Sequence, residues 1–150
     1  MSSTNLTAGE ASREPLPPTT QLQGDSAARI AEDAPLVLLT GVTGFVATHC
    51  AVTLWLAGFR VRGTTRSEGS DKTRAVRALA DSIGVPAHGL ELAECPDLTR
   101  SEGWAEAAAG CDFCLHVASP YTTVIPKDEN ELIRPAIDGT ANVLKVCLPL

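Results

Sequence analysis

Short apolar runs alternate with helical patterns four times between residues 36 and 148, and this alternation limits the chain to few folds. Strands are expected at 36–39, 59–66, 90–92 and 113–117. Helices are expected at 44–57, 71–84, 101–109 and 128–148. Such an order predicts right-handed, parallel strand–helix–strand units. The expected fold class is therefore α/β, with a partial doubly wound parallel sheet of about four strands.

Each expected helix carries apolar residues at helical spacing, and we expect this face to pack on the sheet. The inward residues predicted from spacing are Val46, Cys50, Leu54 and Ala57 in the first helix, Ala75, Val76 and Leu79 in the second, and Ile133, Ile137, Thr140, Leu144 and Cys147 in the last. Asp71 is expected to cap the second helix.

The loop after the first strand contains two glycines at a strand-to-helix corner. A side chain at Gly41 or Gly44 would obstruct a tight turn and hold a pyrophosphate away from the backbone. The first amides of the next helix point at the same place. The corner is either a plain tight turn or, as its context favours, a dinucleotide cradle. The residues expected to contact the dinucleotide are Thr40, Gly41, Thr43, Gly44, Phe45 and Val46.

The second strand ends in Arg66, where a unit that binds NAD has an acid for the ribose hydroxyl. A guanidinium can fork onto a 2′-phosphate, which an acid would repel. We therefore expect Arg66 to select NADP(H), with Lys72 adding a second positive charge. The alternative is that both are ordinary solvated side chains.

Several stretches together resemble the extended short-chain dehydrogenase/reductases of the dihydroflavonol-reductase and cinnamoyl-CoA-reductase type, in the NAD-dependent epimerase/dehydratase superfamily. They are TGVTGFVA at 40–47, VRGTTRS at 61–67, PDLT at 96–99, GCDFCLHVASP at 110–120, PKDE at 126–129, and IRPA with DGTANVL in the last helix. The resemblance implies a Rossmann domain, NADP(H) as cofactor and reduction of an aldehyde or ketone.

The resemblance also implies roles for residues after the third and fourth strands. Asp97 would accept a hydrogen bond from the adenine amino group, and Leu98 would pack on the adenine ring. Val117, Ala118 and Ser119 would line the nicotinamide ribose. Two alternatives stay open, in which Asp97 simply caps the turn at Thr99 and Val117 is plain core.

Reductases of this type use a Ser and a Tyr-x-x-x-Lys pair, which this sequence lacks. The single tyrosine, Tyr121, is followed four residues later by Ile125, and Lys127 comes six residues later. We therefore expect no catalytic residue, a domain cut short with an exposed edge at the fourth strand, weakened NADPH binding and no turnover. A small carbonyl substrate is expected only in a full-length form.

Two other functions fit the sequence less well. One is a non-catalytic NADP sensor, or a decoy subunit that pairs with a full-length relative. The other is an NAD-dependent sugar epimerase or dehydratase, against which Arg66 argues.

Composition excludes several other classes. Residues 1–34 lack an apolar period and contain Pro15, Pro17 and Pro18, so we expect a disordered tail before a domain at 35–150, the N-terminal part of an NADP-binding Rossmann domain. The net charge of -6 and the scattered bases exclude a nucleic-acid surface. No apolar run suits a membrane span or signal peptide, so we expect a cytoplasmic protein. Cys111 and Cys114 lack a second ligand pair, so no metal site is expected.

Overall fold

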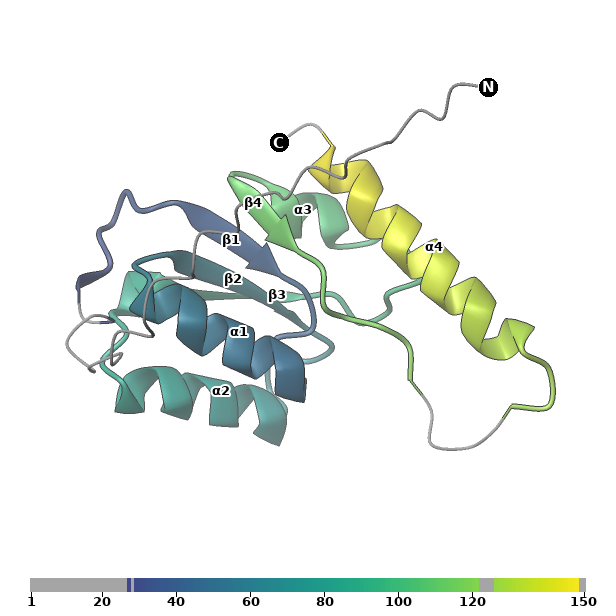
Figure 1. Ribbon diagram of the computed structural model, residues 1–150, viewed down its shortest axis with the longest axis horizontal. Helices are drawn as coiled ribbons and strands as arrows, with labels where there is room; N and C mark the ends of the chain where they lie inside the picture. The colour runs from purple at the N-terminus through teal and green to yellow at the C-terminus, as the bar shows by residue number, and fades with distance from the viewer. Residues whose placement is uncertain (1–26, 28, 122–125, 149–150) are drawn as a thin grey trace, which may run out of the picture.

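The computed structural model describes residues 27, 29–121 and 126–148, which form a parallel sheet with helices on both faces (Figure 1). The strands are β1 (Leu36–Leu39), β2 (Arg60–Thr65), β3 (Leu90–Glu94) and β4 (Phe113–Leu115). They pair in the order β3-β2-β1-β4. The predicted fold class, a partial doubly wound sheet of four parallel strands, is confirmed.

The helices form two layers that sandwich the sheet. Helices α1 (Phe45–Leu56) and α2 (Asp71–Ser82) cover one face, and α3 (Trp104–Ala108) and α4 (Asn130–Cys147) cover the other (Figure 1). A short 3-10 turn, η2 (Ala87–Gly89), precedes β3. Every predicted element is present in its predicted order, and the 3-10 turn η2 was not expected.

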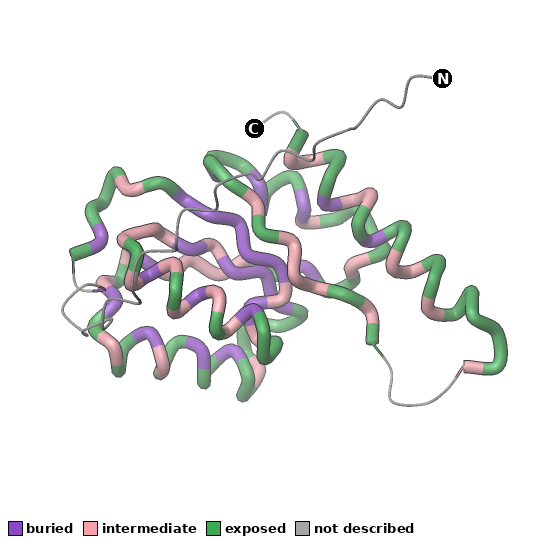
Figure 2. The backbone as a smooth tube through the Cα atoms, viewed as in Figure 1, coloured by how far each residue is buried: buried purple, intermediate pink, exposed green. Residues whose placement is uncertain are grey.

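Strand β1 is buried along its whole length because both layers pack on it (Figure 2). Leu39 belongs to the apolar core shared with α1 and α2. Leu36 and Leu38 belong to the second core, shared with α3 and α4. This explains why the first strand is a continuous apolar run rather than an alternating one.

Helix α1 packs through a different face from the one predicted. Its buried residues are Ala47, Ala51 and Trp55, one position along from the predicted stripe. Val46 is 59% exposed. The small side chains of the two alanines let the helix approach the sheet closely, and Trp55 completes the contact by donating its indole N–H to the Gly89 carbonyl at 3.0 Å. The spacing of the larger apolar side chains did not indicate this face, because two of its three buried residues are alanines.

Helices α2 and α4 also correct the predictions. In α2 the buried residues are Thr73, Val76 and Ala80, and the N-cap is Ser70 rather than Asp71. In α4 only Gly139 and Val143 are buried. The predicted inward residues Ile133, Ile137, Thr140 and Leu144 of that helix are exposed. The reason is that α4 meets the loop after β3 along its small-residue face, where a side chain on Gly139 would lie 2.4 Å from Leu98 Cγ.

Ile30 precedes the predicted domain boundary at residue 35 but packs against the fold. Ile30 is only 4% exposed and belongs to the core on the α1 and α2 side. Its carbonyl is 2.8 Å from His88 Nε2. Residues 1–26 and 28 of the predicted tail lie outside the described residues.

The two residues of the Cys-x-x-Cys pair pack on the same side of the sheet. Cys111 precedes β4, and both Cys111 and Cys114 pack into the core beside α3 and α4. Within the described residues, no three side chains of His, Cys, Asp or Glu lie close enough to share a metal ion. In the same part of the chain, no helix is long and apolar enough to cross a bilayer.

Strand β4 forms one edge of the sheet and pairs with β1 alone among the described strands. Phe113 is 55% exposed on this edge, and Leu115 is also exposed. An apolar sheet edge of this kind is open to further pairing.

Candidate functional site

A cleft of about 980 Å³ opens where the parallel strands end, at the corner where α1 begins. All of the predicted site residues except Thr40 line it: Gly41, Thr43, Gly44, Phe45, Val46, Arg66, Lys72, Asp97, Leu98, Val117, Ala118 and Ser119. Thr40 is fully buried beneath the cleft. The carboxyl edge of a doubly wound sheet is where such folds bind ligands.

The turn from β1 into α1 needs glycine at Gly41 for two reasons. Its φ of 67° lies in the left-handed region, and a Cβ there would lie 3.0 Å from the Ala118 Cβ. The amide of Gly41 donates to Thr64 Oγ1 at 3.0 Å, and that of Gly44 donates to the Gly41 carbonyl at 2.9 Å. A side chain on Gly44 would lie 3.2 Å from that same carbonyl oxygen. The backbone of the turn is thus held in a tight conformation, and neither glycine places a side chain between this backbone and the cleft.

The first turn of α1 carries positive potential that nothing in the described residues neutralises. Its N-cap, Gly44, has no side chain to offer, and the first turn contains no acid. Within the described residues, the amides of Phe45, Val46 and Ala47 have no acceptor, since the first helical bond comes from Thr48. All three residues line the cleft. Free amides at a helix N-terminus favour an anion at that place.

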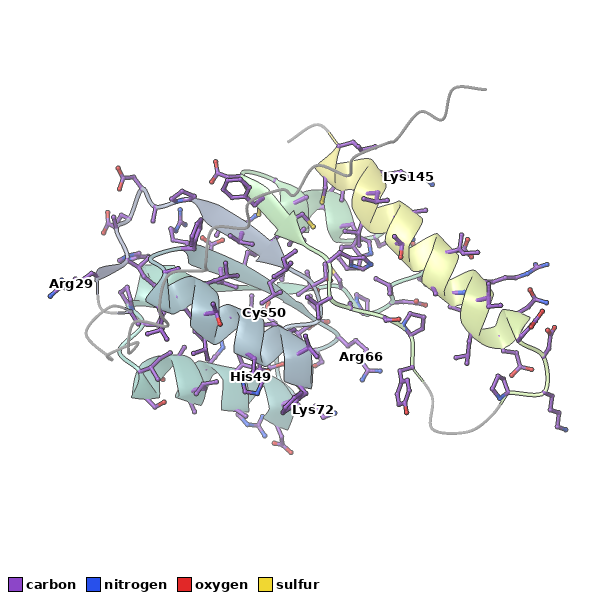
Figure 3. The ribbon with its side chains drawn as sticks, in the orientation of Figure 1. Arg29, His49, Cys50, Arg66, Lys72 and Lys145 are labelled. Atoms are coloured by element: carbon purple, nitrogen blue, oxygen red, sulfur yellow. The ribbon has the colours of Figure 1, made fainter. Side chains whose placement is uncertain are left out.

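Two cations stand at the same end of the cleft, near the end of β2. Figure 3 shows Arg66 and Lys72 close to the start of α2, both far from Lys145. Both are exposed, and neither makes an ion pair with any described residue. The acids nearby in the sequence are engaged elsewhere: Glu68 lies 3.5 Å from Arg77, and Asp71 pairs with Arg74. The two charges are therefore available to a ligand.

The loop that presents Arg66 is fixed by hydroxyl groups. Thr73 Oγ1 donates to the Ser67 carbonyl at 2.8 Å and lies 2.9 Å from Thr65 Oγ1. Ser70 Oγ accepts from the Thr73 amide at 3.2 Å, which caps α2. Because these groups satisfy one another, the loop holds its shape without a ligand.

Asp97 caps its own loop, as one alternative for this residue predicted. Its Oδ1 accepts from the Thr99 amide at 2.9 Å and from the Thr99 hydroxyl at 2.8 Å. These bonds, with a smaller contribution from Arg100, lower the pKa of the carboxyl below its usual value. Its Oδ2 lies 3.7 Å from Arg100 Nε. Leu98, beside it, is held by α4, where Asn142 donates to the Leu98 carbonyl at 3.2 Å.

Strand β4 ends at Leu115, two residues before the predicted end, because a side chain takes over its hydrogen bonding. The amides of Val117 and Ala118 both donate to Thr40 Oγ1, each at 2.9 Å. The chain therefore leaves the sheet and passes over the Gly41 turn, so Val117, Ala118 and Ser119 line the cleft.

Sequence reasoning missed several residues of the cleft wall: Ala47, Thr64, Thr65, Cys95, Pro96, Thr99, Trp104, Pro120, Tyr121 and Pro135. Trp104 is 2% exposed, and its indole N–H has no acceptor among the described residues. Cys95, Trp104 and Tyr121 lie outside the stretches that carry the family resemblance. The other residues lie within those stretches, but no role was predicted for them, since the cleft wall is assembled from loops far apart in the chain. Tyr121 is exposed at the rim, and Ile125, four residues on, lies outside the described residues.

Comparison with known proteins assigns the family. Residues 37–149 match the model of the NAD dependent epimerase/dehydratase family. The chain belongs to this family. Tetraketide alpha-pyrone reductase 1 of Arabidopsis thaliana is 37% identical over 111 residues, which cover 74% of this chain and 33% of that protein. An anthocyanidin reductase of Vitis vinifera is 34% identical over 116 residues, covering 73% of this chain and 31% of that protein.

A dihydroflavonol 4-reductase of Hordeum vulgare is 31% identical over 112 residues. Among solved structures, Gre2 of Candida albicans in complex with NADPH is 28% identical, with a TM-score of 0.62 over 77% of this chain and 33% of that one. The expected resemblance to dihydroflavonol-reductase-like proteins is confirmed. The chain spans about a third of the length of the curated relatives it matches.

Proposed function

We propose that this chain binds NADP(H) as the dinucleotide-binding part of an NADPH-dependent carbonyl reductase. The observation that carries the proposal is the shared cleft. In it, a helix N-terminus without a side-chain cap or an acid lies beside two cations that make no ion pair with the described residues. The first suits a pyrophosphate and the second a 2′-phosphate. The likeness to Gre2, whose structure contains NADPH, supports the same assignment.

The proposed contacts follow the chain in order. The Gly41 turn and the amides of Phe45 and Val46 hold the pyrophosphate, with Thr40, Thr43 and Gly44 shaping the turn around it. Arg66 and Lys72 hold the 2′-phosphate. Leu98 packs on the adenine, and Asp97 uses its outer oxygen toward the adenine amino group. Val117, Ala118 and Ser119 border the ribose at the nicotinamide end.

The chemistry that NADPH would supply is a hydride for a carbonyl carbon. The 150 residues contain no Tyr-x-x-x-Lys pair to provide the accompanying proton. We therefore assign cofactor binding to these residues, and we propose carbonyl reduction only for a protein that also has such a pair. A cytoplasmic location and pairing with a full-length relative remain part of the same proposal.

The test is a titration of the chain with NADPH and NADH, following nucleotide fluorescence. A single charged hydrogen bond from Arg66 predicts that NADPH binds about ten- to a hundredfold more tightly than NADH. Arg66→Glu should abolish that preference, while the matched reversal Arg29→Glu, at an exposed arginine far from the cleft in Figure 3, should preserve it. Equal affinity for the two nucleotides would contradict the role of Arg66, and no binding of either by a folded chain would contradict the proposed function.

A further inference from the structure

The hydroxyl of Thr40 makes three hydrogen bonds beneath the cleft, and their directions can be assigned. Its oxygen is 2.9 Å from the amide nitrogens of both Val117 and Ala118, which can only donate. It is also 2.8 Å from His116 Nδ1. A hydroxyl has two lone pairs and one hydrogen. Since both lone pairs accept from the amides, the hydrogen must point at His116 Nδ1.

This assignment determines the state of the His116 ring. Nδ1 accepts from Thr40, so it carries no proton, and in a neutral ring the proton then lies on Nε2. Nε2 faces Thr140 Oγ1 of α4 at 3.4 Å. A proton on Nδ1 would confront a hydroxyl whose lone pairs are already used, so protonation of the ring would break the arrangement.

The surroundings of His116 favour the same neutral state. The ring is partly buried between β1, β4 and α4, and burial lowers its pKa below the usual value. Burial is the only cause of that shift, so no charged side chain of these elements contributes among the described residues. Asp138 and Lys145 of α4 are exposed.

The hydrogen bonds of Thr40 set the position of one wall of the cleft. Ala118 is so close to the Gly41 turn that a Cβ on Gly41 would lie 3.0 Å from the Ala118 Cβ. The three residues that follow His116 line the cleft. Loss of the Thr40 bonds would release the backbone of Val117 and Ala118 from this turn, and the width of the cleft would change.

We propose that His116 is a positioning residue of the dinucleotide site. As a neutral ring with its proton on Nε2, it orients the Thr40 hydroxyl, which holds the backbone of Val117 and Ala118 against the Gly41 turn. Nucleotide affinity therefore depends on His116 staying neutral and falls as the pH drops below the usual histidine range. This inference rests on the proposed function for its ligand, but its structural part concerns the free protein.

The first experiment uses the free chain and needs no nucleotide. Nitrogen-15 NMR of the imidazole rings should show His116 with an unprotonated Nδ1 and a protonated Nε2 at pH 7.5. Amide hydrogen exchange at Val117 and Ala118 should be slow in the wild type and at least about tenfold faster in His116→Leu and Thr40→Val. A proton on Nδ1, or unchanged exchange in both variants, would overturn the proposal.

The second experiment measures NADPH affinity at pH 7.5 and 5.5. His116→Leu and Thr40→Val should weaken binding about tenfold at pH 7.5, whereas Thr40→Ser and His116→Asn should restore it, because serine keeps the hydroxyl and asparagine offers an uncharged acceptor. Thr53→Val, at an exposed threonine of α1 whose hydroxyl donates to the His49 carbonyl of the same helix, is the matched control and should bind as the wild type does.

The pH dependence separates His116 from the nucleotide, since a phosphate group itself titrates near pH 6. The wild type should lose more affinity between pH 7.5 and 5.5 than His116→Asn does. The extra loss in the wild type is then due to protonation of the His116 ring. An equal loss in both proteins would sink the proposal. If the folded wild type binds no NADPH, the proposed function fails, while the NMR and exchange results still decide the role of His116.

Discussion

Helices α1 and α2 are both twelve residues long and pack side by side on the same face of the sheet, but their first turns differ (Figure 1). Helix α2 is capped by Ser70 and has Asp71 in its first turn. Helix α1 has glycine as its cap and no acid. One helix neutralises its own N-terminus, whereas the other leaves free amides in the cleft.

The difference shows that two similar helices can serve different ends, one favouring stability and the other ligand binding. A side-chain cap stabilises a helix by about 1 kcal/mol, so its absence in α1 costs stability that α2 retains. That same absence leaves donors with no partner in the described residues, which an anionic ligand can satisfy. Four changes test or sharpen this contrast.

The largest effect is expected at the turn before α1. Gly41→Ala places a Cβ against Ala118 in a left-handed backbone, which costs roughly 1–2 kcal/mol from conformation alone. We expect NADPH affinity to fall by at least about a hundredfold, with a lower unfolding temperature. Gly69→Ala, before α2, meets open space and should alter neither quantity. Normal binding by Gly41→Ala would show that the turn does not approach the ligand.

A carboxylate in the first turn of α1 would make that turn resemble the first turn of α2. Val46→Asp should stabilise the helix by about 0.3–1 kcal/mol through its dipole, yet weaken NADPH binding about tenfold by repelling phosphate. The unfolding temperature should therefore rise while the affinity for NADPH falls. Val46→Asn is the uncharged control and should change affinity far less. Tighter binding by Val46→Asp would place the phosphates elsewhere.

The converse change removes the cap of α2. Ser70→Ala should destabilise the fold by about 1 kcal/mol, because the Thr73 amide loses its acceptor. Denaturant unfolding measures this loss. NADPH affinity should stay within about twofold, since Ser70 does not line the cleft and the Thr73 hydroxyl still holds the loop through the Ser67 carbonyl. A large loss of affinity would mean that the cap also positions Arg66 and Lys72.

The smallest effect is expected at Asp97, which caps its own loop as Ser70 caps α2. Its pKa is lowered in the folded chain, so its bonds to Thr99 stabilise the fold above the usual carboxyl range. That contribution is lost as the pH falls through and below about 4. Asp97→Asn should therefore reduce the change in unfolding temperature between pH 5 and 3. An identical acid profile in both proteins would contradict this account.

Local pattern predicted the part of the cleft around Gly41, Gly44 and Arg66. These residues stand at the ends of predicted strands, and a parallel sheet brings such ends to one edge. The positions of Asp97, Leu98 and 117–119 in the site were predicted from the family resemblance instead. Trp104 and Pro135 could not be predicted from local pattern, because they reach the cleft from α3 and α4, far along the chain. The bonds of Thr40 to Val117 and Ala118 span more than seventy residues, so no local pattern records them.

The sequence by itself determined the order of the elements and the glycine turn, since periodicity and backbone freedom are local properties. Tertiary packing decided which helix faces are buried. Ala47 and Ala51 of α1 and Gly139 of α4 lie inward, because small residues allow close approach, while the larger Val46 and Ile137 stay exposed. Packing also ended β4 at Leu115, where one buried hydroxyl replaces the next strand bonds. Which helix face is buried and where a strand ends depend on the fit between surfaces that are far apart in the sequence. That fit exists only in the folded chain.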